Sequence, residues 1–258
     1  LTFTNPPPTN PSSDDIVDNH FSMLAGISID FCVSTNRLDL LYNVVFTKFV
    51  DCDRGNIFVD LLAPFVMTNR LTYIAPECMG VFADHCVATG DMARFENCLL
   101  HLDVTILDFD MVIKLLKRNH MHSALFHVFN TGLHDYTTPL AILLTRLFSV
   151  AGKCDNVGRD RCDGRIVNLF ETLGYKALLY VTRISGGRSF PVDESLDVGG
   201  DGGLSSIHND MVKFLAQKEV PPISNTTNTT TNPYHNQQYP YLSILLLVDA
   251  KITLDCCR

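Results

Sequence analysis

Apolar residues recur at helical spacing through most of the first 150 positions. In the segment NRLDLLYNVVFTKF (36–49) they fall three or four residues apart, at Leu38, Leu41, Tyr42, Val45 and Phe49. This spacing places side chains on one face of an α-helix. A second helix fits positions 56–66, and no alternating strand pattern competes between 36 and 150. The pattern therefore predicts a series of amphipathic helices.

Capping residues divide this pattern into short helices. Asp14 can cap a first helix, Pro76 suits a first helical turn, and Gly90 can take the left-handed conformation that ends a helix before Asp91 caps the next. Further along, Asp108 is expected to start a helix, 118–120 a turn, and Gly132 to stop the helix that begins at 121. Inward positions in this part are Phe95, Leu99, Leu102, Phe109, Val112, Ile113, Leu116, Ala124, Leu125 and Val128.

Short helices joined by short turns place each helix antiparallel to the one before it. The sequence thus predicts an all-α fold, an irregular α-solenoid of antiparallel helix pairs with loop insertions; no strict repeat period is found. We expect a linker at 1–13, a helical-hairpin array at 14–150, in which Thr138 and Pro139 open the last helix, and a continued helical region at 151–218. That region has loops at 152–165 and 186–203, and a helix over 166–184 in which a break near Gly174 stays open. An Asn/Thr-rich disordered insertion at 219–238 and the start of a further helix at 239–258 complete the chain.

Composition and charge narrow the function. The chain is 46% hydrophobic with a formal net charge of -8, and its basic residues are scattered, which argues against a nucleic-acid partner. Nine cysteines, mostly within apolar segments, indicate buried reduced thiols in the cytoplasm. Apolar runs such as 242–248 are shorter than a membrane-spanning helix needs. We therefore expect membrane association only through partners.

A cluster of histidines and aspartates is the main candidate for catalysis. It would use His101, Asp103, Asp108, Asp110, His120, His122, His127 and His134 as metal ligands in a metal-dependent hydrolase. Paired imidazoles on a helix normally lie four residues apart, as in HExxH, whereas His120 and His122 are two apart. A solvated or turn role is therefore favoured, and we expect no catalytic, metal-binding or cofactor-binding residue. A domain that binds a small molecule would need a closed apolar pocket, which a sequence does not reveal.

Several blocks resemble one protein family in the same order. They are LDLLYNVVFTKF, PFVMTNRL before APECM, LLHLDVTILDFDMVIKLLKRNHMHSALFHVFNTGLHDYTTPL, LLYVTRISGGRSFP and YPYLSILLLVD. The chain is similar to the central region of the eighth vacuolar protein sorting family. Members of that family are subunits of the CORVET endosomal tethering complex. A HOPS-type tether subunit, which shares this architecture, fits the blocks less well.

The resemblance implies a non-enzymatic scaffold that acts in vesicle fusion and endosomal sorting. It implies a cytoplasmic protein, peripheral on early and late endosomes, whose partners are class C vacuolar-sorting core subunits and an early-endosomal Rab GTPase, which other regions of the parent protein could contact. It offers no catalytic residue. Residues interpreted as caps, close-packing points and turns are Asp103, Asp108, Ala124, Gly132, Pro139, Gly187, Arg188 and Pro191.

Overall fold

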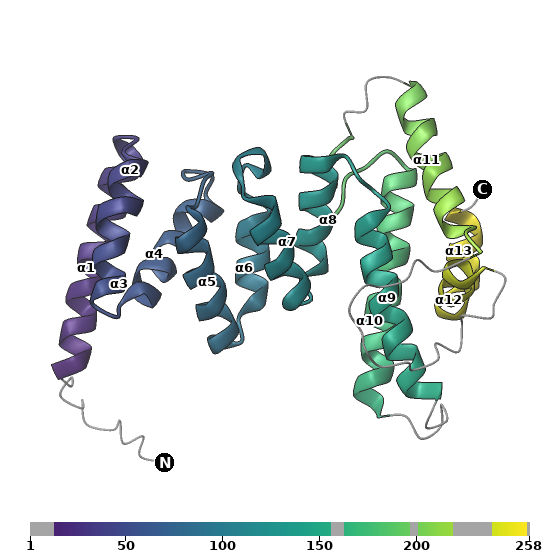
Figure 1. The fold of residues 1–258 in the computed structure, drawn as a ribbon, viewed down its shortest axis with the longest axis horizontal. Helices are drawn as coiled ribbons and strands as arrows, with labels where there is room; N and C mark the ends of the chain where they lie inside the picture. The colour runs from purple at the N-terminus through teal and green to yellow at the C-terminus, as the bar shows by residue number, and fades with distance from the viewer. Residues whose placement is uncertain (1–12, 156–162, 197–200, 219–238, 257–258) are drawn as a thin grey trace, which may run out of the picture. The chain divides into compact units, whose positions relative to one another are not determined.

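The computed structural model describes residues 13–155, 163–196, 201–218 and 239–256, and these residues are helices and their connections (Figure 1). Within these ranges there is no strand, only an isolated bridge between Arg188 and Ser195. The predicted all-α class is confirmed. The chain divides into two compact units, Leu1–Leu115 and Leu116–Arg258, with the division inside one helix.

Unit 1 is a succession of helices in which each packs on its neighbours. Its elements are α1 (Ser13–Ser34), α2 (Leu38–Leu40), the π-helix η1 (Leu41–Phe46), α3 (Thr47–Asp51), α4 (Gly55–Met67), α5 (Pro76–Thr89), α6 (Met92–Leu99), the 3-10 helix η2 (Val104–Ile106) and most of α7 (Phe109–Arg118). Helix α4 packs against α1, α5 and α6. Its buried positions Phe58, Val59, Leu62, Ala63 and Val66 have the three-and-four spacing of one helical face.

Three turns of unit 1 share one geometry. Asn36, Asp53 and Asn69 have φ values of 53°, 57° and 57°, in the left-handed region. Each is followed by an arginine whose backbone N–H bonds the carbonyl five residues earlier, at 2.8 Å from Arg37 to Cys32, 2.8 Å from Arg54 to Phe49 and 3.0 Å from Arg70 to Phe65. This is the Schellman motif, which satisfies the last carbonyls of a helix.

Each of these arginines also pairs with an aspartate. Arg54 Nε lies 2.7 Å from Asp18 Oδ1 and Arg70 Nη2 lies 2.8 Å from Asp30 Oδ1, so the turns after α3 and α4 are tied to α1. Arg37 pairs locally with Asp39 at 3.1 Å. The turns thus fix neighbouring helices as well as ending them.

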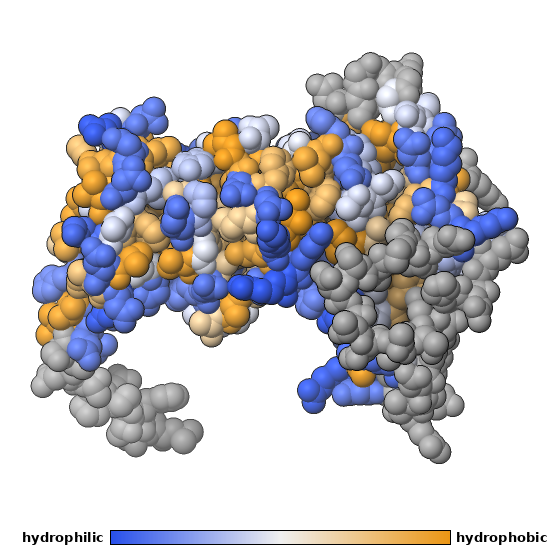
Figure 2. All heavy atoms as spheres, in the orientation of Figure 1, coloured by the Kyte–Doolittle hydropathy of each residue, from blue (hydrophilic) through white to orange (hydrophobic). Residues whose placement is uncertain are grey.

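Helix α1 exposes an apolar face. Met23, Leu24, Ile27 and Phe31 are each more than half exposed, whereas Ala25, Ile29 and Cys32 are buried in unit 1. Hydrophobic atoms of α1 reach the surface at the left of Figure 2. The span Asp14–Ser34 is also long and apolar enough, by length and composition alone, to cross a membrane. The expectation that every apolar run is too short is therefore wrong for α1.

Unit 2 is built around one long helix. Its elements after α7 are α8 (His122–Val128), the π-helix η3 (Phe129–Leu133), α9 (Thr138–Asp155), α10 (Gly164–Ser185), α11 (Asp201–Leu215), α12 (Pro240–Val248) and α13 (Ala250–Cys256). Helix α10 packs against α9, α11, α12 and α13. The rings of Phe126 and Tyr180 stack with centroids 3.9 Å apart, and the Tyr180 hydroxyl lies 2.9 Å from Asn130 Oδ1 and 2.8 Å from the Tyr136 carbonyl. The core of unit 2 therefore joins residues far apart in the sequence.

Several predicted boundaries in unit 2 are wrong. Helix α9 continues to Asp155 and α10 begins at Gly164, so the loop at 152–165 is shorter than expected, and α11 begins at Asp201 inside the loop at 186–203. Helix α10 runs through Gly174 without a break. In unit 1, α1 already includes Ser13, the last residue of the expected linker. The rest of that linker and the insertion at 219–238 lie outside the described residues.

Candidate functional site: polar contacts between α4, α5 and α6

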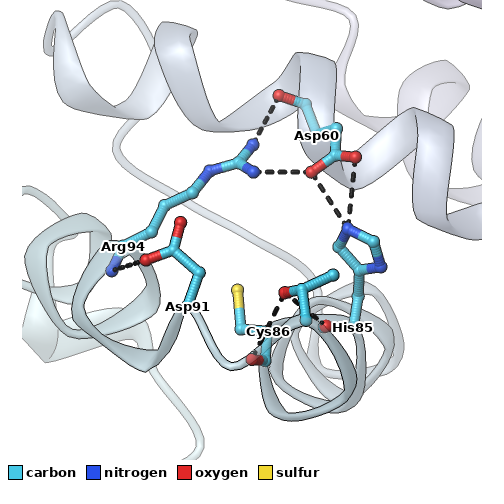
Figure 3. A network of polar contacts seen from close by, with 6 residues as sticks. Asp60, His85, Cys86, Asp91 and Arg94 are labelled. Atoms are coloured by element: carbon cyan, nitrogen blue, oxygen red, sulfur yellow. Dashed lines mark hydrogen bonds and ion pairs between the residues drawn. The ribbon is translucent and has the colours of Figure 1, made fainter.

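A carboxylate at the centre of unit 1 joins three successive helices. Asp60 on α4 lies 2.6 Å, through Oδ1, from Arg94 Nη1 on α6. His85 Nε2 on α5 lies 3.1 Å from each of the two Asp60 carboxylate oxygens. Figure 3 shows the three side chains converging. Their half-buried positions shield these contacts from solvent more than an ordinary surface ion pair.

The backbone of α4 supplies a fourth contact because of a proline. Pro64 lies inside α4, four residues after Asp60, and has no N–H to bond the Asp60 carbonyl. Arg94 Nη2 donates to that carbonyl oxygen at 2.7 Å. The arginine thus replaces the missing helical hydrogen bond and pairs with the side chain of the same residue.

The turn between α5 and α6 positions Arg94. Gly90, with φ of 76°, ends α5, and the Asp91 carboxylate accepts a hydrogen bond from Arg94 N at 3.3 Å, so that Asp91 caps α6. The Arg94 guanidinium also lies 5.8 Å from the ring centroid of Phe82. A cap, a left-handed glycine and an aromatic ring therefore direct this side chain toward α4.

This arrangement suits holding helices together better than covalent catalysis. Cys86, next to His85, is 1% exposed, and burial raises the pKa of its thiol although the charge of Arg94 acts in the opposite direction. A raised pKa disfavours the thiolate, which is the reactive form of cysteine. The acceptors of Asp60 are already occupied by Arg94 and His85. The site is best described as a polar tie between α4, α5 and α6.

The histidines and aspartates considered as metal ligands are dispersed. His101 Nδ1 lies 2.9 Å from Asn69 Oδ1, Asp110 pairs with Lys114 at 2.6 Å, and His134 has a left-handed backbone with φ of 51°. His127, on α8, makes a further contact of its own. Among the described residues no group of three or more His, Cys, Asp or Glu side chains is placed to hold a metal ion.

His122 differs from its predicted solvated role. It is the first residue of α8 and only 6% exposed, and its ring lies nearly parallel to that of His120 with centroids 6.3 Å apart. Burial lowers the pKa of His122 to about 4, and the nearby charges of Lys176, His120 and Arg146 act in the same direction. The sequence signal was weak, since only the apolar neighbours Met121, Ala124 and Leu125 hinted at burial.

The two aspartates among the predicted capping residues lie at element starts in unit 1. Asp103 Oδ1 accepts from Thr105 N at 3.0 Å at the start of η2, and hydrogen bonds to the Thr105 side chain and backbone lower the pKa of its carboxyl. Asp103 N also donates to the Thr72 carbonyl at 2.8 Å. Asp108 Oδ1 accepts from Met111 N at 3.1 Å in the first turn of α7.

The other predicted structural residues lie in unit 2. Ala124 is fully buried on α8, Pro139 is the second residue of α9, and Gly132 lies within η3. Since η3 continues to Leu133 and the left-handed residue that follows is His134, the prediction that Gly132 stops the helix is wrong.

Three of these residues meet in one hairpin-like turn after α10. Gly187 has φ of 73° and ends α10 with the Schellman bonds, Arg188 N to the Arg183 carbonyl at 2.9 Å among them. Arg188 Nε lies 2.7 Å from Asp193 Oδ1, and Arg183 pairs with the same carboxylate. The peptide bond between Phe190 and Pro191 is cis. Here too an arginine after a left-handed residue pairs with an aspartate.

Comparison with known proteins gives a consistent result. Residues 57–258 match the family model described as Vps8 central TPR. The chain is 24% identical over 241 residues, 93% of its length, to a vacuolar protein sorting-associated protein 8 homolog of Homo sapiens, and 22% identical over 203 residues, 77% of its length, to vacuolar protein sorting-associated protein 8 of Saccharomyces cerevisiae. It spans about 15% of the length of each of these relatives. No solved structure matches the chain.

Proposed function

Because the chain belongs to the Vps8 central TPR family, we propose that it is a non-enzymatic scaffold segment of a CORVET-like endosomal membrane-tethering subunit. It would act in vesicle fusion and in protein sorting from endosomes to the vacuole or lysosome. The observation that carries this proposal is the family match over residues 57–258, most of the helical array.

The physical character of the array supports a scaffold. In unit 1 each helix is fixed to its neighbours by buried apolar side chains, by Schellman turns with paired arginines and by the polar tie at Asp60. Helical arrays of this kind present extended surfaces and serve as platforms for other proteins. The polar residues singled out in the sequence mostly stabilise turns and helix contacts.

Partners and location follow from the same proposal. The protein would bind class C vacuolar-sorting core subunits, and the early-endosomal Rab GTPase would bind directly or through other regions of a longer protein. It would be cytoplasmic and peripheral on endosomal membranes, held there by these partners. The names of the relatives state a role in vacuolar protein sorting for those proteins alone.

A capture experiment tests the proposal. The tagged 258-residue chain is incubated with cytosol, and bound proteins are quantified by mass spectrometry. We expect class C subunits to be enriched on the wild-type chain and lost with Ala124→Asp, which places a charge in the core of unit 2.

The matched control is Ser149→Asp, which adds the same charge at an exposed position of α9. It should retain the class C subunits. Absence of these subunits from the wild-type capture, or equal recovery with Ala124→Asp, would contradict the proposal.

A further inference from the structure

Four basic side chains gather in unit 2, and we call them the basic cluster: His120, His122, Arg146 and Lys176. They come from the turn before α8, from the first position of α8, from α9 and from α10. The two imidazole rings are 6.3 Å apart and inclined by 21°, and Lys176 Nζ donates to Ser123 Oγ, beside His122, at 2.9 Å. Lys176 of α10 thus contacts the residue beside His122, and the charge of Arg146 on α9 acts on both imidazoles.

The buried member of the cluster is without a hydrogen-bond partner. His122 is 6% exposed, and neither of its ring nitrogens has a partner among the described residues. Buried polar side chains in folded proteins are nearly always bonded, and an unpaired one costs free energy. A ligand that accepts a hydrogen bond from this ring would remove that cost.

Among the described residues, no carboxylate is paired with a member of the cluster. The positive charges of Lys176 and Arg146 act on His122, and that of Arg146 also acts on His120. In the part of the chain that the structure describes, neither Arg146 nor Lys176 forms an ion pair with a carboxylate. Basic groups held together without a counter-charge favour an anionic ligand.

We propose that the basic cluster binds the phosphate group of a phosphorylated serine or threonine carried by a partner protein. A phosphate dianion has three strong acceptor oxygens, enough for the guanidinium of Arg146, the ammonium of Lys176 and an imidazole N–H. A carboxylate has two oxygens and half the charge. The proposal goes beyond the scaffold function, because it assigns a ligand chemistry to named residues.

A partner protein is favoured over a membrane by the form of the site. His122 is 6% exposed and both of its ring nitrogens are buried, so a single projecting group suits the cluster better than a broad anionic surface. Unit 2 as a whole has fourteen Lys and Arg against thirteen Asp and Glu, a formal charge of +1. Docking on an anionic membrane instead uses a broad surface with many basic residues.

The first test uses inorganic phosphate as the probe. The ring nitrogens of the chain labelled with nitrogen-15 are followed by NMR at neutral pH, and His120→Gln and His122→Gln identify their signals. We expect phosphate to shift both signals, and Arg146→Gln or Lys176→Gln to weaken the apparent affinity at least about tenfold. Arg165→Gln and Lys213→Gln, at exposed positions of unit 2, should leave it unchanged.

Three results of this titration would overturn the proposal. They are signals that do not move with phosphate, equal affinity in the cluster variants and the controls, and acetate binding as tightly as phosphate. Circular dichroism of each variant shows that the helices are retained, so that a lost shift reports binding rather than folding.

The second test separates the sources of the phosphate. A short phosphoserine peptide is compared with its unphosphorylated form, and vesicles containing phosphorylated inositol lipids are compared with vesicles lacking them. Binding of the phosphopeptide that depends on Arg146 and Lys176 supports the proposal. Binding of inorganic phosphate alone, or of the vesicles without the peptide, would show that no phosphorylated partner is recognised.

Discussion

The two units of the chain use different means to hold their helices. Unit 1 depends on contacts between helices that lie close together in the chain, with a polar or ionic contact at nearly every turn. It carries six Lys and Arg against fifteen Asp and Glu, a formal charge of -9. Unit 2 is arranged around α10 and one apolar core of aliphatic and aromatic side chains, with a formal charge of +1. Neighbour-to-neighbour contacts allow local opening, whereas a shared core favours unfolding as a whole.

The largest expected effect is on the core of unit 2. Ala124→Asp would bury an unpaired charge, at a cost of about 3 to 5 kcal/mol in the free energy of unfolding. Hydrogen exchange measured by mass spectrometry should show faster exchange through α8, α9 and α10 together. Exchange that increases in α8 alone would contradict a shared core.

A glycine at a helix contact gives the second effect. A Cβ at Gly174 on α10 would lie 2.4 Å from Val248 Cγ2 on α12, so Gly174→Ala should destabilise unit 2 by about 2 to 3 kcal/mol in urea unfolding. Val248→Ala in the same chain should recover most of the loss. Gly26→Ala on α1, where nothing lies within 4 Å, is the control and should stabilise slightly.

The third effect is on the pH dependence of unit 2. The pKa of buried His122 is lowered to about 4, below its value in the unfolded chain. The unfolded state therefore binds more protons between these values, and stability present at neutral pH is lost as the pH falls through the window. From pH 7 to pH 5 we expect a loss of about 2 kcal/mol from this group.

His122→Gln, which does not titrate, should flatten that part of the pH profile. His120, Arg146 and Lys176 lie around the same ring and remain in the variant. An unchanged slope between pH 7 and pH 5 would show that the pKa of His122 is not lowered in the folded state.

The fourth effect is on the polar tie of unit 1. Asp60→Asn removes the charge that Arg94 and His85 share, at a cost of about 1 to 2 kcal/mol. Because unit 1 relies on neighbour contacts, increased hydrogen exchange should be confined to α4, α5 and α6. Asp110→Asn, which breaks the exposed pair with Lys114, should have almost no effect; equal effects of the two variants would contradict the tie.

The smallest effect is expected at a turn. Asp53 has φ of 57°, which costs a residue with a Cβ about 1 kcal/mol, so Asp53→Gly should raise the stability of unit 1 by roughly half that amount. Thermal unfolding monitored by circular dichroism measures the change. A lower melting temperature would indicate that the Asp53 side chain makes a stabilising contact.

The sequence predicted features that depend on residues close together in the chain. Asp91 and Asp108 accept hydrogen bonds from the first turns of α6 and α7, and Gly90 adopts the left-handed conformation that ends α5. Each follows from the preferences of one residue and its neighbours within three positions.

Features that join distant residues could not be predicted in this way. Asp60, His85 and Arg94 come from three helices, and nothing local marks them as a group. Gly174 suggested a break because glycine disfavours helices, whereas its role is to admit Val248 of α12. The sequence predicts a solvated His122, because the packing of α8 against α10 depends on residues far apart in the chain.

The Schellman turns of unit 1 recur at nearly regular intervals along the sequence. A left-handed residue followed by arginine recurs at intervals of 17 and 16 residues, at Asn36-Arg37, Asp53-Arg54 and Asn69-Arg70. The helical segments that these pairs end show no evident sequence repeat among themselves. Each pair consists of an Asn or Asp that tolerates a left-handed backbone and an arginine that forms an ion pair. The pair therefore identifies the turn even where the helices on either side are not similar in sequence. When relatives of about one-quarter identity are aligned, matching these pairs first would fix the register of the sequence alignment. The apolar pattern of the helices alone would allow an alignment shifted by one helical turn.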